Sequence, residues 1–182
     1  MNTTERIAPW IQTLNGRAFD FENMSRNKWD WKETATILSR LPRFTAHSRW
    51  RYSVAQHSVL VSRRFDTRSL RLVGLIHDVP EAFINDISSP VKHWLRDFGG
   101  TDALNVLEDR IWEWVAKQHL IDPWMIEKIK QEDLAALATE ARDLMLPPPR
   151  PWIELPDPWP DRIDVWSEEY ARDEWIRAYH EI

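Results

Sequence analysis

The sequence predicts an all-α protein, and three observations favour this fold class. Apolar residues recur at the three- and four-residue steps of a helix, and no segment alternates convincingly as a half-buried strand would. The chain has 182 residues, of which 43% are hydrophobic and 29% charged, so it can bury one sizeable globular core. Only four residues are glycine, and this composition excludes a collagen-like or wholly disordered chain.

The N-terminal half is expected to hold three helices after an irregular start. Residues 1–28 are predicted to be irregular or to form a short helix, with a turn at 15–16. The first predicted helix covers 30–40 and ends because a proline follows. The second covers 53–64, where serine is a typical N-cap, and the third covers 67–78, before another proline.

Helices are also expected in the second half of the chain. One is predicted to begin at 88–90, where proline occupies the first turn, and to end before the Gly-Gly pair at 99–100. Apolar stripes predict two more helices, over 104–118 and from 122 to about 145.

The C-terminal segment differs in composition. Residues 147–160 contain seven prolines, which predicts an extended linker, and a last helix is expected over 163–180. We therefore divide the chain into a core, 1–146, and an extension, 147–182, that packs on the core or on a neighbouring subunit. Three of the twelve tryptophans are interpreted as core residues rather than as a base-stacking platform: Trp112, Trp114 and Trp124.

Several function classes are excluded by what the chain lacks. Without cysteine it can form no disulfide, Cys-ligated zinc site, iron–sulfur cluster or thiol nucleophile, so any metal must be held by His and carboxylate. No apolar run approaches the roughly 20 residues of a spanning helix, and the first residues do not resemble a secretory signal. We expect a cytoplasmic protein with no membrane partner.

Charge is unevenly distributed along the chain. The net charge of −5 argues against a stable nucleic-acid partner. Residues 34–65 nevertheless hold six arginines and no acid, whereas the last 33 residues hold nine acids and four arginines. A local basic segment suits a small phosphorylated ligand; the alternative is that these arginines pair with acids elsewhere. They are Arg40, Arg43, Arg49, Arg51, Arg63 and Arg64.

Four titratable residues are expected to point inward from apolar helix faces: His57, His77, Asp78 and Asp133. Burying an isolated carboxylate is costly, and one divalent cation would satisfy all four groups. Two imidazoles and two carboxylates suit Mn, Co, Zn, Ni or Fe and leave positions for water and substrate. The alternative is a buried network of ion pairs and hydrogen bonds.

These four residues also carry a family resemblance. His57, then His77-Asp78, then Asp133, resembles the H…HD…D signature of HD-domain metal phosphohydrolases. Two longer strings, PRFTAHSRWRYSVAQHSVLVSRRF (42–65) and LIHDVPEAFINDISSPVK (75–92), resemble small bacterial and phage members of that family. These members include 5′-deoxynucleotidases and deoxynucleoside triphosphohydrolases.

The resemblance, which covers about residues 30–145, implies a compact HD-domain helical bundle that binds one divalent metal ion. It implies a nucleotide substrate and a homo-oligomer, either a dimer or a hexamer. The four inward residues would be the metal ligands.

The resemblance implies six further site residues. Two acids would act on the attacking water: Glu81 and Asp86. Four side chains would bind substrate, with Arg43 and Lys92 on phosphate, Phe44 near the base or sugar, and His47 on phosphate or the leaving oxygen. Each also has a plain structural interpretation, as a cap, a surface ion pair, a structural charge or a core ring. Ala46 stands where many relatives have glycine, so base specificity stays open.

The expected function is removal of phosphate or polyphosphate from 2′-deoxynucleoside 5′-phosphates. Two enzyme types agree with this function: a triphosphohydrolase, with dATP as one candidate substrate, and a 5′-deoxynucleotidase. The arginine-rich segment slightly favours several phosphates, which would bring additional Mg or Mn. One alternative is a two-metal HD oxygenase or phosphodiesterase, for which His93 and His119 are poorly spaced. Others are a non-catalytic nucleotide-binding HD protein and, against the acidic balance, a single-strand nuclease.

Overall fold

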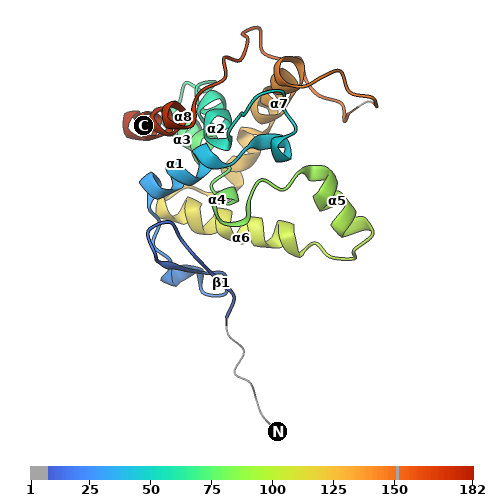
Figure 1. Ribbon diagram of the computed structural model, residues 1–182. Helices are drawn as coiled ribbons and strands as arrows, with labels where there is room; N and C mark the ends of the chain where they lie inside the picture. Colours follow the sequence, from blue (N-terminus) through green and yellow to red (C-terminus); the bar gives the residue numbers. More distant parts are fainter. Residues whose placement is uncertain (1–7, 151) are drawn as a thin grey trace.

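The computed structural model describes residues 8–150 and 152–182, and the chain is mostly helical, as predicted (Figure 1). Residues 1–7 of the predicted irregular start and Pro151 of the predicted linker lie outside the described residues. The helices are α1 (Trp31–Arg40), α2 (Val54–Ser62), α3 (Arg68–Ile76), α4 (Glu81–Ile84), α5 (Ser89–Asp97), α6 (Ala103–Gln118), α7 (Lys130–Leu144) and α8 (Glu168–Glu181). None of these helices is of a length and apolarity that would let it cross a membrane.

The first three helices begin within one residue of the predicted starts, and each follows a side-chain cap, of which the sequence predicted that of Ser53. Asp30, Ser53 and Thr67 each accept hydrogen bonds from backbone N–H groups of the first turn. The third helix is shorter than predicted, because its last helical residue is Ile76 and His77 is its C-cap. The two residues of the HD pair therefore lie at and just beyond the end of α3.

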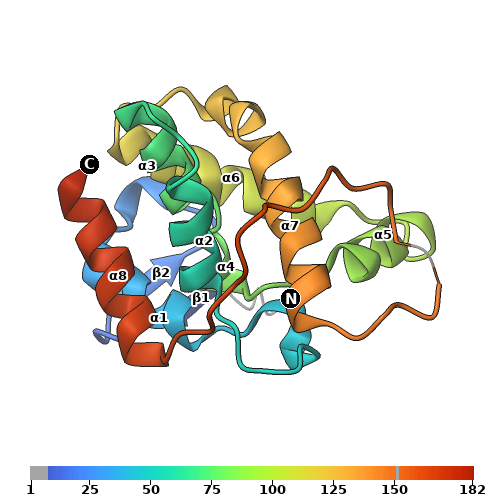
Figure 2. The ribbon, with the colours of Figure 1, turned by 90° about the horizontal axis from the view of Figure 1, so that it is seen from above.

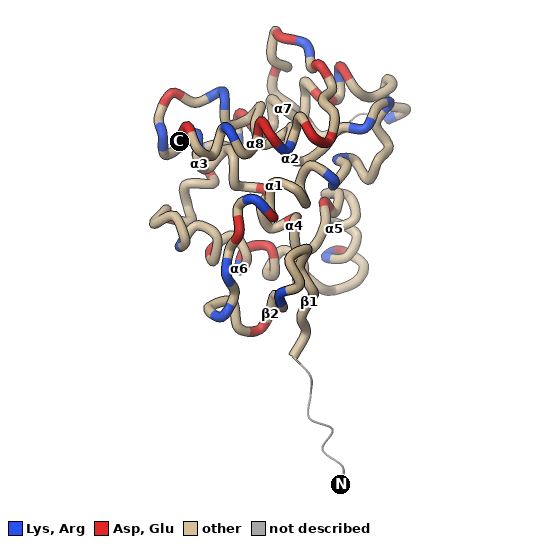
Figure 3. The backbone as a smooth tube through the Cα atoms, turned by 60° about the vertical axis from the view of Figure 1, so that its left-hand side comes forward, with Lys and Arg blue, Asp and Glu red and all other residues tan. Residues whose placement is uncertain are grey.

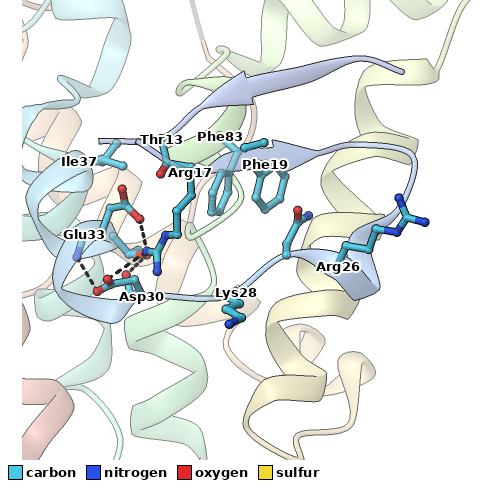
Figure 4. A pocket seen from close by; sticks show the side chains of 12 residues that line it. Thr13, Arg17, Phe19, Arg26, Lys28, Asp30, Glu33, Ile37 and Phe83 are labelled. Carbon is cyan, nitrogen blue, oxygen red and sulfur yellow. Dashed lines mark hydrogen bonds and ion pairs between the residues drawn. The ribbon is translucent and has the colours of Figure 1, made fainter. Parts of the chain in front are cut away.

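A two-stranded antiparallel hairpin corrects the prediction that the chain has no strand. Strand β1 (Trp10–Gln12) pairs with β2 (Ala18–Asp20), and each is too short to show an alternating pattern. Arg17 at the turn binds Asp30 at 3.0 Å and Glu33 at 2.8 Å, which ties the hairpin to α1 (Figure 4).

Three other predictions about the C-terminal half need correction. The segment from 122 forms a short 3-10 helix, η3 (Pro123–Lys128), and only then α7, with buried Ile129 between them. The last helix starts five residues later than predicted, where Ser167 supplies its cap. Trp112 and Trp114 are buried as expected, but Trp124 is 53% exposed.

Helix α2 lies at the centre of the fold and packs against α1, α3, α7 and α8. All but one of its residues are buried. Helix α8 lies across α1 and α2 (Figure 2), and its Trp175 is fully buried and donates to the Leu75 carbonyl oxygen. Helix α5, in contrast, contributes no buried residue and lies beside the main body (Figure 1).

Candidate metal centre

Three elements bring His57, His77 and Asp133 together. His57 Nε2 lies 3.3 Å from His77 Nε2 and 2.9 Å from Asp133 Oδ1. His77 Nε2 is 3.6 Å from the same carboxylate oxygen. One donor atom from each residue lies within 4.8 Å of the others, so the group could hold a metal ion. This convergence was predicted from three separate helix faces.

The close approach of α2 and α3 positions the two imidazoles. A Cβ atom at Gly74 would lie 3.0 Å from the Ser62 Cα atom, so glycine permits this helix contact. One turn later, His77 directs Nδ1 to the Gly74 carbonyl oxygen at 2.9 Å. Because a carbonyl only accepts, Nδ1 is the donor, which leaves Nε2 of a neutral ring free to bind a cation.

Asp78, the fourth predicted ligand, lies beside this group. Its Oδ1 is 3.2 Å from His77 Nε2, and its Oδ2 is 3.5 Å from His57 Nε2. Arg43 Nη1 also contacts Oδ2, at 3.4 Å. Asp78 is therefore near enough to join the three ligands through a small side-chain movement.

Sequence reasoning missed the buried carboxylate of Glu140. It is 0% exposed and lies 2.7 Å from His57 Nδ1 and 3.1 Å from Arg43 Nη2. Glu140 follows Asp133 by seven residues, or two helical turns, on the same face of α7. Extending the inward stripe by one more turn would have found it.

The charges around the centre favour a cation. Burial and Arg43 act to lower the pKa of His57, but Glu140 and Asp133 outweigh them and raise it to about 9. The pKa of Asp133 is well below its usual value because, despite burial, it accepts hydrogen bonds from both histidines. The donor set of two imidazoles and carboxylates fits a first-row transition metal ion.

A cleft of about 330 Å³ opens beside the candidate ligands, and Glu81 and Lys92 line it. Glu81 Oε2 is buried and has no hydrogen-bond partner among the described residues. Burial, together with the nearby Asp78 and Asp86, holds the pKa of Glu81 well above its usual value. Lys92 Nζ is 2.6 Å from Glu108. Asp86 does not line the cleft, and burial raises its pKa.

The other predicted substrate residues lie outside the lining of this cleft. The Arg43 guanidinium is bound by Glu140 and Asp78, Phe44 is half-buried with its ring 6.3 Å from that of Trp152, and His47 is exposed. Phe44, Thr45 and Ala46 have φ angles of 56°, 52° and 63°, a left-handed turn that favours glycine. The backbone at Ala46 is therefore strained in a way that glycine would not be.

The structure favours the alternative interpretation of the arginine-rich segment, residues 34–65, in which its charges pair with acids elsewhere in the chain. In the folded chain, basic and acidic residues lie close together around α2, α7 and α8 (Figure 3). Two of the six arginines bind Glu168 of α8, one binds Glu174, and the others contact Glu140, Asp161 or the ring of Trp50. The segment thus joins the acidic C-terminal extension to the core, and it no longer favours a polyphosphate ligand.

The fold and site define a mostly helical protein with a candidate His/Asp metal centre. No family model matches the chain. It is 33% identical over 137 residues to the uncharacterized protein YfdR of Escherichia coli (strain K12), covering 75% of this chain and 73% of that one. The chain belongs to the YfdR family. It is also 31% identical over 91 residues to an uncharacterized protein of Rhodobacter capsulatus, covering 46% of each chain.

Proposed function

We propose that this protein is an HD-domain metal-dependent phosphohydrolase acting on 2′-deoxynucleoside 5′-phosphates. The observation that carries the proposal is the convergence of His57, His77 and Asp133, with Asp78 beside them. All of these residues except the fully buried His57 line a cleft of about 330 Å³. These four residues match the H…HD…D signature. The proposed reaction, phosphoester hydrolysis, is taken from the resemblance of the sequence to HD-domain phosphohydrolases.

His57, His77, Asp133 and Asp78 would hold one divalent transition metal ion, such as Mn, Co, Zn, Ni or Fe. When bound, the ion would lower the pKa of a coordinated water and polarise a phosphoryl oxygen. Neither His93 nor His119 belongs to the candidate group, and the ring of His119 packs on Trp29 at 4.5 Å. This supports one ion rather than the two of an oxygenase or phosphodiesterase.

Glu81 would position the attacking water and accept its proton. Its unpartnered Oε2 atom offers the free acceptor that this role needs. Asp86 contributes indirectly, because its charge is one cause of the raised pKa of Glu81.

Lys92 would bind a substrate phosphate at the rim of the cleft. Its ammonium group is bound by Glu108, so the phosphate would have to displace that carboxylate or share the ammonium with it. Arg43 would act through Asp78 rather than on substrate, because both ends of its guanidinium contact carboxylates.

Both a monophosphate and a triphosphate substrate stay within the proposal. The cleft is acidic, with two lysines, Lys92 and Lys130, against six carboxylates, so a triphosphate would need further Mg or Mn for charge compensation. The six are Asp78, Glu81, Glu108, Asp109, Glu127 and Asp133.

The test is a panel of deoxy- and ribonucleoside mono-, di- and triphosphates, each incubated with Mn²⁺, Co²⁺, Zn²⁺ or Ni²⁺. Chromatography would score released nucleoside, phosphate and tripolyphosphate, with Asp133→Asn as the inactive control. We expect nucleoside release from at least one deoxynucleotide. Nucleotide binding without release from the metal-loaded protein would instead indicate a non-catalytic nucleotide-binding protein.

Metal content and assembly are separate parts of the proposal. We expect one tightly bound ion per chain, and two bridged ions would favour the oxygenase or phosphodiesterase. A homo-oligomer is proposed as well, and the exposed rings of Trp94 on α5 and of Phe98 at its C-cap are candidates for its contact. Light scattering of the purified protein would test for a dimer or hexamer.

A further inference from the structure

We propose that Glu140 is a positioning residue that holds two metal ligands, His57 and Asp78, in their binding orientation. The inference rests on the metal centre of the proposed phosphohydrolase. It concerns how the centre is built, whichever nucleotide is cleaved.

Each carboxylate oxygen of Glu140 has a different partner. Oε1 lies 2.7 Å from His57 Nδ1, and Oε2 lies 3.2 Å from Arg43 Nε and 3.1 Å from Arg43 Nη2. Glu140 is fully buried, so no water competes for these contacts at the side-chain surface. The Tyr52 hydroxyl also hydrogen-bonds to this carboxylate.

The first contact selects the protonation of His57. An ionised carboxylate can only accept, so Nδ1 carries the proton. When a metal ion displaces the proton from Nε2, this nitrogen would present its lone pair to an ion shared with His77 and Asp133, which lie 3.3 Å and 2.9 Å from it. A histidine whose second nitrogen donates to a carboxylate is a stronger and better-oriented metal ligand.

The second contact reaches Asp78 through an arginine. Glu140 holds Arg43 by two nitrogens, and the third, Nη1, contacts Asp78 Oδ2 at 3.4 Å. Asp78 follows the end of α3 in a turn, where its carbonyl oxygen accepts from Glu81 N–H at 3.0 Å, and Arg43 is the cation that contacts its side chain. One buried carboxylate on α7 therefore orients ligands that come from α2 and from the residues after α3.

The experiment compares Glu140→Gln with wild type by calorimetric titration of Mn²⁺ and Zn²⁺ into metal-free full-length protein. Glutamine keeps the size but offers only one accepting oxygen for three donor partners: His57, Arg43 and Tyr52. We expect metal affinity to fall by about 10- to 100-fold. Glu140→Asp, which keeps the charge, should recover part of that loss.

Glu174→Gln is the matched control for burying an amide in place of a carboxylate. Glu174 lies on α8, away from the metal centre, is 3% exposed and pairs with Arg63. Thermal melts of both metal-free variants would confirm that they are folded. We expect the control to bind metal with wild-type affinity.

A second readout is nitrogen-15 NMR of histidine-labelled, zinc-loaded protein. The wild type should show a protected proton on His57 Nδ1, and Glu140→Gln should lose that protection.

Wild-type metal affinity in folded Glu140→Gln, or an Nδ1-bound metal in wild type, would overturn the inference. Loss of affinity in a protein that cleaves no nucleotide would uphold it and reject only the proposed reaction. A wild type that binds no metal would overturn both.

Discussion

The four candidate ligands differ in how strongly their surroundings hold them. His57 is fully buried and contacts carboxylates at both ring nitrogens, whereas the Asp133 side chain is 39% exposed at the cleft wall. His77 is fixed by a backbone carbonyl, and Asp78 by an arginine. The exposed side of the centre therefore faces the cleft, where substrate would enter.

Metal binding and turnover should respond differently to changes at two carboxylates that line the cleft, Asp133 and Glu81. Asp133→Asn should abolish both, because it removes a charged ligand. Glu81→Gln should keep wild-type metal affinity and lower turnover by roughly 10²- to 10⁴-fold, because it removes only the proton acceptor. Calorimetry and a nucleotide-release assay measure the two effects. Near-normal turnover in Glu81→Gln would remove this residue from the mechanism.

Metal affinity should depend on pH through His57. In the metal-free protein its pKa is raised from 6.5 to about 9, so a proton occupies the imidazole at neutral pH and competes with the metal ion. Affinity should therefore rise as pH increases from about 6.5 toward about 9. Titration at several pH values, with a chelator of known affinity as reference, would measure this. A flat profile would contradict the raised pKa.

The raised pKa of His57 also makes the stability of the metal-free protein depend on pH. The folded-state pKa of His57 lies above the unfolded value, so protonated His57 stabilises the metal-free fold fully below pH 6.5. This contribution is lost as pH rises through about 9, the range in which metal binding takes its place.

At the scale of helices and strands, local signals predicted starts better than ends. Asp30, Ser53 and Thr67 cap their helices through hydrogen bonds within one turn, so their role is written in the nearby sequence. The hairpin was missed because three-residue strands show no periodicity, and the start of α8 was misplaced because the preceding segment is held by distant contacts. Ile163 N–H, for example, donates to Asp143.

The contact between α2 and α3 should be sensitive to one methyl group. Gly74→Ala would place a Cβ atom 3.0 Å from the Ser62 Cα atom and push the helices apart. The strain of about 1–3 kcal/mol should exceed the gain of about 1 kcal/mol in helix propensity. We expect lower stability by urea unfolding and weaker metal binding. Ser69→Ala, on the exposed face of the same helix, should change neither, and an unchanged Gly74→Ala would refute the close contact.

For the whole molecule, the C-terminal extension is part of the folded body. Helix α8 packs on α1 and α2 of the same chain, and the acids of the extension pair with the arginines of residues 34–65. The opposite charge of these two segments, visible in the sequence, is thus matched within one chain.

Trp175 should be the main anchor of this extension. Trp175→Ala would remove a fully buried ring and its hydrogen bond to Leu75, and should lower the free energy of unfolding by about 3–5 kcal/mol. Trp124→Ala, at a ring that is 53% exposed, should stay within about 0.5 kcal/mol of wild type. Denaturant unfolding followed by circular dichroism would compare them. Equal stability of the two variants would show that α8 is dispensable to the core.

The sequence by itself determined the helical class, most helix starts and the inward faces of His57, His77 and Asp133, because caps and apolar periodicity act within a few residues. Only the tertiary structure decided the partners of charged groups: Glu140 with His57 and Arg43, and Glu168 with the basic segment. Those pairs join residues about 80 to 130 positions apart, and their choice follows from which helices pack together. Local pattern cannot reveal that choice, since many acids in the chain offer the same charge.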